Sequence, residues 1–382
     1  MKTLFFYCIF EIISLMFIYA AQTKRNKYLI NNNKKNISIK STSNLTIKRY
    51  NIIFFLSMVP IIILIGLRNI SVGYDTSAYV EVFFRVLSDS LRVSDSEWLS
   101  VGYIFLCKII GFFSNDSYVL YNLTFATLTV YFLYKSIWEN SKNPVFSIFI
   151  LFSTCLVYQA FNQSRQMLAI SMMLYAWKYI EKKQIKKYLL MCLLAFSIHK
   201  SALVMLPFYW ISKIKINKKT LIKYTISSTF IFAFFGTIKK VLLMTYYGKT
   251  YLDRGFFSSQ TSTVFNLIFR LGLLFACLYY SKYIKEDEKK ELNGLFNMSI
   301  WCIMFQLLTL KIYIFGRITT YFYIFYVLLI PNIYAKISSK KKKTVFLVMN
   351  IFLFVIFHIC YFFLVSASSG YDEFFWFFQS RG

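Results

Sequence analysis

The chain has 382 residues, of which 58% are hydrophobic, 21% are aromatic and only 16% are charged. Soluble domains average about 25% charged residues, so this composition excludes an ordinary soluble protein. The formal net charge of +28 does not indicate a nucleic-acid-binding protein, because the basic residues stand in short clusters between long apolar runs. This arrangement is typical of a protein that crosses a membrane many times.

Apolar stretches recur along the whole chain. A bilayer span needs roughly 20 apolar residues, and fewer when the helix is buried in a bundle. We therefore predict an all-α polytopic membrane protein, with a single transmembrane domain over residues 1–382 and about ten spans. In chain order, these spans cover residues 4–21, 51–67, 117–137, 144–161, 165–180, 221–238, 264–283, 294–313, 316–335 and 345–365.

Lysine-rich loops set the predicted orientation. By the positive-inside rule, the short basic loops are cytoplasmic; they cover residues 24–49, 182–187, 213–223, 282–290 and 336–343. An outer loop at 68–98, which is rich in acidic residues, a second outer loop at 245–263 and the tail after 366 then face the exterior. Both termini lie on that side as well.

Two apolar segments do not fit this count, so we predict that they are short dipping or re-entrant helices. Residues 99–113 form a short run that contains Lys108. Residues 189–211 have lysines at both ends and the tripeptide 199–201 (His-Lys-Ser) in the middle, which predicts two half-helices that meet there. A backbone break at membrane depth needs surrounding protein or a water-filled cavity, so both segments predict an interior cavity.

Metal ligands and cofactor motifs are sparse in the sequence. Among the 2 histidines, 7 cysteines and 16 acidic residues, no cluster occurs at metal-binding spacing. The cysteines all lie in apolar stretches without a C-x-x-C motif, which indicates core residues. Neither a Walker loop nor a G-x-G-x-x-G motif is present. We therefore expect no metal and no cofactor.

Most arginines lie on the predicted outer side, although lysine alone would satisfy the positive-inside rule. A guanidinium binds phosphate or carboxylate through two parallel hydrogen bonds and stays charged, so an outer pyrophosphate is one candidate ligand. The arginines that begin or end apolar helices are the strongest candidates, namely Arg68, Arg165 and Arg317. Pairing with outer-loop acids or lipid headgroups is the better explanation for Arg85, Arg92 and Arg381.

Motifs along most of the chain resemble those of the EpsG-type and Wzy-type polysaccharide polymerases. Residues 66–79 (GLRNISVGYDTSAY) resemble the signature G-x-R-x-x-x-x-G-x-D-T-x-x-Y. Residues 97–103 (EWLSVGY) are similar to the segment E-x-x-(x)-x-G-(F/Y), although tryptophan follows the glutamate where the family often has proline. Residues 162–169 (NQSRQMLA) resemble N-x-x-R-Q-x-x-A. Residues 199–207 resemble H-x-S-A…L-P, and residues 316–322 resemble G-R-x-x-x-Y-F.

The resemblance implies a metal-independent glycosyltransferase with a GT-C-like fold in the bacterial inner membrane, with its active site facing the periplasm or exterior. Such polymerases join oligosaccharide repeat units carried on undecaprenyl pyrophosphate into O-antigen, capsule or exopolysaccharide. A sugar hydroxyl attacks the anomeric carbon of another unit, and the lipid pyrophosphate leaves. The implied partners are these lipid-linked oligosaccharides, membrane lipids, a chain-length regulator and a flippase, with no nucleic acid.

The motifs and the outer arginines together define the expected site. The expected catalytic residues are His199, Asp75 and Arg165. Pyrophosphate or sugar binding is expected of Arg68, Tyr79, Glu97, Arg254, Arg270, Arg317 and Tyr321. We expect Arg165 and Arg317 to hold the donor pyrophosphate from opposite helices, where helix N-termini add partial positive charge.

Several polar residues keep two interpretations. Asp75 either orients sugar hydroxyls, or serves as a base, or caps a helix that starts at Thr76. His199 is either a general base or a hydrogen-bonded core residue. His358 is typical of a core residue, and Glu11 in the first span indicates pairing rather than chemistry.

Alternative functions also stay open. A lipid-linked oligosaccharide flippase or exporter would share the basic cavity, but would usually show internal repeats, which we do not find. An O-antigen-ligase-like glycosyltransferase would use similar chemistry. A membrane O-acyltransferase would use a histidine base too, but nothing else in the sequence indicates acyl-CoA.

Overall fold

The computed structural model describes residues 2–35, 51–92, 99–114, 117–237, 240, 244, 260–312, 315–370 and 373–379. Within these ranges every regular element is a helix, and the one β-bridge joins Arg68 to Trp376. The prediction of an all-α protein is therefore confirmed for this part of the chain. The second outer loop predicted at 245–263 lies almost entirely outside the described residues.

Several helices match the composition of a membrane span. Among the described residues, four helices are long and apolar enough to cross a membrane; they are Thr3–Ile30, Thr263–Tyr283, Phe315–Lys336 and Lys340–Leu364. Shorter apolar helices cover Asn51–Gly66, Val101–Phe113 and Pro144–Ser153. The chain is thus a multi-pass membrane protein, while the count of about ten spans and the re-entrant segments stay predictions.

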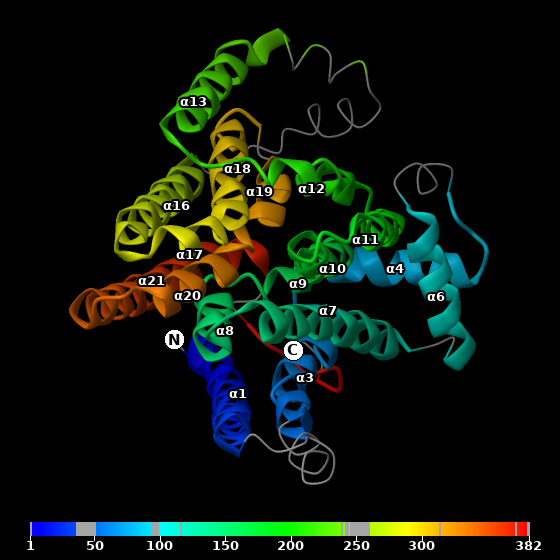
Figure 1. Ribbon diagram of the computed structural model, residues 1–382. Helices are drawn as coiled ribbons and strands as arrows, with labels where there is room; N and C mark the ends of the chain where they lie inside the picture. Colours follow the sequence, from blue (N-terminus) through cyan, green and yellow to red (C-terminus); the bar gives the residue numbers. More distant parts are fainter. Residues whose placement is uncertain are drawn as a thin grey trace. The chain divides into compact units, whose positions relative to one another are not determined.

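The chain folds into two compact units, which we describe one at a time. Unit 1 contains Met1–Lys178, Leu190–Lys200 and Leu353–Gly382, and unit 2 contains Tyr179–Leu189 and Ser201–Phe352. Figure 1 labels the helices of both units. The first three family motifs, at 66–79, 97–103 and 162–169, belong to unit 1.

Unit 1 is built around one central helix. The helix α7 packs against α3, α4, α6 and α8, and α1 packs against α3 and α8. The elements of unit 1, including helices that continue into unit 2, are α1 (Lys2–Lys35), α3 (Val59–Gly66), α4 (Thr76–Leu87), α6 (Val101–Phe113), α7 (Tyr118–Asn140), α8 (Pro144–Ser153), α9 (Gln159–Asn162), α10 (Ser164–Glu181), α11 (Ile185–Ile198) and α21 (Lys340–Ser369).

Polar caps start the central helices of unit 1. The Ser117 hydroxyl accepts a hydrogen bond from the Leu120 backbone N at the start of α7. The Asn143 side chain does the same for Phe146 at the start of α8, where Pro144 occupies the first helical position. Each cap satisfies a backbone N–H that would otherwise lack a partner in the helix.

The prediction of one continuous helix over 144–161 is wrong, because the helix breaks in the middle. The helix α8 ends at Ser153, and α9 begins only at Gln159. Between them Cys155 has φ 54°, a left-handed conformation that cannot continue a right-handed helix. The Cys155 backbone N donates to the Phe152 carbonyl O over 2.7 Å, which closes a tight turn. No glycine or proline in the sequence marks this break.

The tail of the chain returns to the loop that follows α3. The Asn69 backbone N donates to the Phe375 carbonyl O over 2.8 Å, and the Phe377 backbone N donates to the Leu67 carbonyl O over 3.0 Å. The Gly73 backbone N donates to the Gly370 carbonyl O over 2.7 Å. The tail and the loop that follows α3 are therefore joined by main-chain hydrogen bonds, while the predicted orientation of both segments stays a prediction.

The break predicted at residues 199–201 is confirmed. The helix α11 ends at Ile198, and a 3₁₀ helix, η1 (Lys200–Met205), follows His199 before the short helix α12 (Phe208–Ile211). The short helix predicted at 99–113 is α6. The second half-helix predicted after the break is a 3₁₀ helix followed by a short α-helix, and the dipping of both segments into the membrane stays a prediction.

Unit 2 is organised around α18, which packs against α13, α16, α19 and α20. Asn297 of α18 fixes the loop between α12 and α13, because its Nδ2 donates to the Ile214 carbonyl O over 2.7 Å. Besides η1 and α12, the elements are α13 (Lys218–Ala233), α16 (Gln260–Tyr280), η2 (Ser281–Tyr283), α17 (Glu286–Lys290), α18 (Asn293–Thr309), α19 (Phe315–Tyr323) and α20 (Tyr326–Lys336).

Candidate functional site

The 66–79 loop of unit 1 is held against α9 by its glycine and threonine. Gly73 has φ +85°, and an added Cβ would lie 2.9 Å from the Asn162 Oδ1 and 3.0 Å from the Phe161 carbonyl O. Thr76 Oγ1 lies 2.7 Å from the Val72 carbonyl O and 3.0 Å from the Phe161 carbonyl O. A larger residue at 73 would be strained and would clash, so these two motif residues serve the loop's shape.

Arg68 lies beneath this loop and is only 2% exposed. Its guanidinium donates to the carbonyl O of Ile65 and, over 3.3 Å, to that of Phe161, and it lies 3.4 Å from Thr76 Oγ1. The space beside it does not admit the centre of a water molecule. Burial lowers the pKa of Arg68. A ligand would contact this side chain only after displacing its carbonyl acceptors.

Arg165 lies in the first turn of α10, between two tyrosine rings. Its guanidinium carbon is 4.6 Å from the centre of the Tyr103 ring of α6 and 5.2 Å from that of the Tyr79 ring of α4. The residue is 4% exposed. Ring faces attract a cation, whereas the positive end of a helix favours an anion. Arg165 is therefore a buried cation at the positive end of a helix.

Asp75 stands directly before α4, one helical turn from Tyr79. It occupies the N-cap position, but its side chain makes no capping hydrogen bond, which weakens the interpretation that it serves as a cap. Its backbone N donates to the Asn162 Oδ1 over 3.4 Å. Both Asp75 and Tyr79 are half-buried. The structure therefore brings Asp75, Tyr79 and Arg165 into one region, as the motifs predict.

The end of α11 lies against the start of α6 in the same unit. A Cβ added to Gly102 would lie 2.3 Å from the Ser197 Oγ and 2.8 Å from the Ser197 carbonyl O, so only glycine permits this approach. His199, which is half-buried, follows two residues after Ser197, and its backbone N donates to the Ala195 carbonyl O over 2.9 Å. Tyr103, next to Gly102, contacts Arg165. The end of α11, which His199 follows, is thus packed close to Tyr103, and Tyr103 contacts Arg165.

Other predicted site residues belong to unit 2. Arg270 is 8% exposed, donates to Gln306 Oε1 and lies 4.0 Å from the centre of the Tyr323 ring. The Ser201 Oγ donates to the Tyr321 hydroxyl over 3.0 Å, which joins the histidine motif to the late tyrosine motif. Arg317 is half-buried in the first turn of α19. Predicted residues outside the described part of the chain are Glu97, Arg254 and Arg381.

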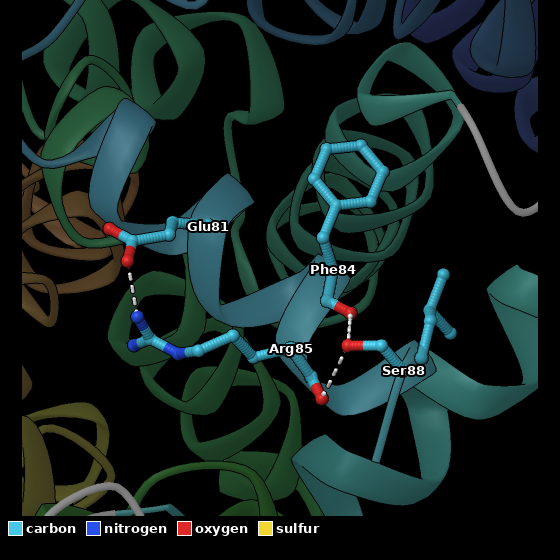
Figure 2. Close-up of a pocket in the computed structure, with 5 residues that line it drawn as sticks. Glu81, Phe84, Arg85 and Ser88 are labelled. Carbon is cyan, nitrogen blue, oxygen red and sulfur yellow. Dashed lines mark hydrogen bonds and ion pairs between the residues drawn. The ribbon is translucent and has the colours of Figure 1, made fainter. Parts of the chain in front are cut away.

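A cavity of about 510 Å³ along α4 is a different feature. Figure 2 shows its lining side chains, with the Arg85 guanidinium directed at the Glu81 carboxylate. Arg92 Nη2 lies 3.3 Å from the same carboxylate. The predicted pairing of Arg85 and Arg92 with an outer-loop acid is therefore confirmed, and this cavity contains none of the predicted site residues.

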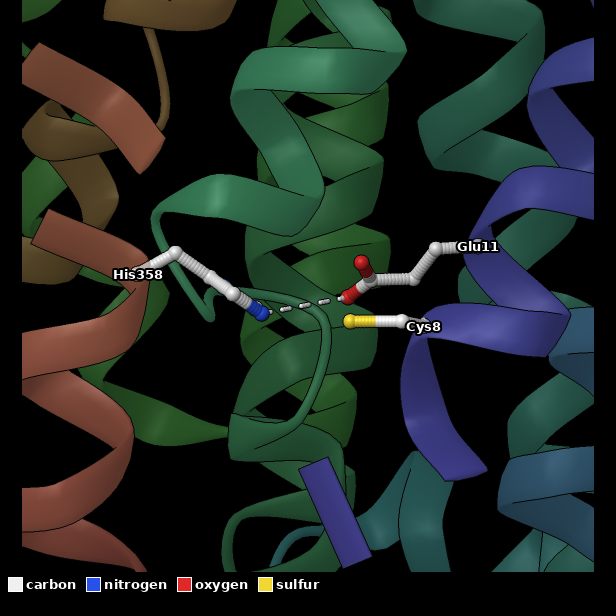
Figure 3. Close-up of side chains that lie close together, drawn as sticks. All are labelled: Cys8, Glu11 and His358. Atoms are coloured by element: carbon white, nitrogen blue, oxygen red, sulfur yellow. Dashed lines mark ion pairs between the residues drawn. The ribbon is translucent and has the colours of Figure 1, made fainter. Parts of the chain in front are cut away.

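The fold also creates a cluster that the sequence pattern did not reveal. Ligand-type atoms of Cys8, Glu11 and His358 all lie within 4.8 Å of one another, as Figure 3 shows. The Tyr158 hydroxyl donates to Glu11 Oε1, so the predicted pairing role of Glu11 is confirmed. Cys8 and Glu11 share a helical face by their spacing, but nothing in the sequence places His358 beside them.

A comparison with protein families identifies the family of this chain. The model of the EpsG family matches residues 51–379. The chain belongs to the EpsG family. The resemblance drawn from the motifs is therefore confirmed, and EpsG membership indicates a membrane protein of polysaccharide biosynthesis. No curated protein and no solved structure matches the chain.

Proposed function

We propose that this EpsG-family protein makes polysaccharide at the outer face of the inner membrane. It does so by joining oligosaccharide repeat units that are carried on a lipid pyrophosphate. The observation that carries the proposal is the position of Arg165, a buried guanidinium at a helix N-terminus between two tyrosine rings. The donor's leaving group is a pyrophosphate, which is the kind of anion that such a spot favours.

In the proposed reaction, a hydroxyl oxygen of the acceptor sugar attacks the anomeric carbon of the donor. The new C–O bond forms as the bond to the pyrophosphate oxygen breaks, and the hydroxyl proton passes to a base. The transition state has oxocarbenium character and a departing negative charge. Arg165 stabilises that charge, and a preorganised cation at the leaving group lowers the barrier without moving during the reaction.

Two residues are candidates for the base. His199 lies at the end of a helix anchored beside the Arg165 site, and a neutral imidazole accepts a proton near neutral pH. Asp75 lies one turn from Tyr79 at the start of α4. We assign His199 as the base and Asp75 as the residue that orients the acceptor hydroxyls. Arg68 holds the loop that carries Asp75.

Arg317 and Arg270 have a separate place in the proposal. Both belong to unit 2. Arg317 lies in the first turn of α19, as Arg165 lies in the first turn of α10. The prediction that Arg165 and Arg317 grip one pyrophosphate stays a prediction. The proposed chemistry at Arg165 does not depend on it.

The test is coupling of purified lipid-linked repeat units by the purified protein in detergent. Arg165→Lys keeps the charge but loses the planar fork, and removal of one stabilising donor of this kind costs about 10²–10³ in rate. The matched control is Arg85→Lys, which changes an arginine of the same unit that pairs with Glu81 at the surface. The control should couple at the wild-type rate.

Two outcomes would overturn the proposal. Coupling by Arg165→Lys at the wild-type rate would remove Arg165 from the reaction. A wild-type protein that forms no glycosidic bond in detergent, yet moves lipid-linked units across vesicle membranes, would be a flippase.

A further inference from the structure

A polar cluster lies between the first and last helices of unit 1, apart from the Arg165 site. Cys8 and Glu11 stand one turn apart on α1, and His358 stands on α21. Figure 3 shows the three side chains directed toward one another. Glu11 and His358 are each only 8% exposed. Ionisable groups in an apolar helix are costly unless they are paired or bind an ion.

His358 and Glu11 are within ion-pair distance but form no hydrogen bond. His358 Nε2 lies 4.0 Å from Glu11 Oε1, which is too long for a hydrogen bond, and this nitrogen has no hydrogen-bond partner. On the other side of the ring, Nδ1 lies 3.4 Å from the Cys155 Sγ. With the ring proton on Nδ1, the lone pair of Nε2 faces the carboxylate and the Cys8 thiol.

We propose that Cys8 Sγ, the Glu11 carboxylate and His358 Nε2 bind one divalent cation of the zinc type. Zinc binds sulfur, nitrogen and oxygen ligands at about 2.0–2.3 Å in a tetrahedron, which places ligand atoms about 3.3–3.7 Å apart. The three atoms lie within 4.8 Å of one another, so a contraction of about 1 Å suffices.

The charges of this site also fit a divalent cation. On binding, the Cys8 thiol and a protonated Glu11 would release their protons to solvent. A thiolate, a carboxylate and a neutral imidazole then carry two negative charges, which the cation cancels. A neutral complex is the form that an apolar environment tolerates best.

The surroundings supply support and an open position. The Tyr158 hydroxyl donates to Glu11 Oε1, and Cys155 fixes the far side of the imidazole; such outer partners orient metal ligands. A cavity of about 720 Å³ borders all three ligands, which leaves room for a fourth ligand. The bound cation would tie α1 to α21.

The first test is metal titration of the purified full-length protein in detergent after treatment with a chelator. We expect one equivalent of Zn²⁺, and Co²⁺ in its place should give the absorption of a cobalt–thiolate bond. Cys8→Ser and His358→Gln should each weaken binding by at least about 10-fold. The matched control is Cys360→Ser, which removes another half-buried thiol and should bind as the wild type does.

A second measurement uses only the wild-type protein, so it does not depend on how the variants fold. Cys8 and Cys360 are the half-buried thiols, and the other cysteines are buried. Saturating Zn²⁺ should slow alkylation of Cys8 by N-ethylmaleimide at least about 10-fold and leave Cys360 unchanged. Equal alkylation of Cys8 with and without Zn²⁺, or unchanged Zn²⁺ binding by a Cys8→Ser/His358→Gln double variant, would overturn the proposal.

Discussion

Arg68 and Arg165 are both buried in unit 1, yet their surroundings differ in kind. Backbone carbonyl oxygens accept hydrogen bonds from the Arg68 guanidinium, which also lies 5.2 Å from the centre of the Phe161 ring. Arg165 lies between the rings of Tyr79 and Tyr103 at the start of a helix. The carbonyl hydrogen bonds of Arg68 fix a loop, whereas the ring faces around Arg165 attract the cation. A buried arginine can therefore serve the fold or a ligand, and its contacts indicate which.

The largest expected effect concerns His199, the proposed base of the Arg165 site. His199→Gln keeps a side chain of similar reach that cannot take up a proton, and loss of a general base costs about 10²–10⁴ in rate. Coupling by the wild type should fall as the pH is lowered, because protonation removes the accepting lone pair of the imidazole. The variant should lack this acid limb in single-turnover assays at several pH values. A loss of coupling rate below about 10-fold would indicate that His199 is a core residue and not the base.

Paired substitutions by methionine separate the two arginines directly. Arg68→Met leaves the Ile65 carbonyl O without this donor and the Phe161 carbonyl O with Thr76 Oγ1 alone. We expect it to lower the free energy of unfolding by about 1–3 kcal/mol. Arg165→Met should lower it by less than about 1 kcal/mol while coupling is lost. Thermal unfolding in detergent measures the first quantity. Equal losses of stability in the two variants would break the comparison.

A smaller effect is expected at Asp75. Asp75→Ser preserves a residue that caps helices well but removes the carboxylate. A hydrogen bond to a charged group contributes about 1.5–3 kcal/mol, so coupling should fall at least about 10-fold with normal protein yield. Wild-type coupling by this variant would favour a purely structural role.

The smallest effect tests the ring beneath Arg165. Tyr103→Leu removes a cation–π contact of about 1 kcal/mol, which should reduce coupling about 5-fold at constant expression. Tyr103→Phe keeps the ring and serves as the control. If the phenylalanine variant is as impaired as the leucine variant, the hydroxyl rather than the ring face matters.

Local patterns predicted much of the fold and part of the site. The apolar runs predicted the positions of most helices. The lysines that flank the segment 189–211 predicted the helix break at His199. The resemblance to the family motifs placed Asp75, Tyr79 and Arg165 in one expected site, and the structure brings these three residues into one region. These features depend on residues close together in the sequence.

Features that depend on tertiary contacts could not be predicted in this way. The left-handed Cys155 interrupts an apolar run that has no glycine or proline, so periodicity alone predicts a continuous helix there. The approach of His358 to Glu11 joins the first and last helices. Without a comparison of homologues, no local signal indicates such a pair.

The contacts of the tail also bear on the order of events during biosynthesis. The loop around Arg68 and Gly73 emerges from the ribosome long before its main-chain partners at Gly370, Phe375 and Phe377. The loop that carries Asp75 therefore gains these bonds only after the helices between them have been synthesised. A nascent chain that stalls before Gly370 lacks these bonds.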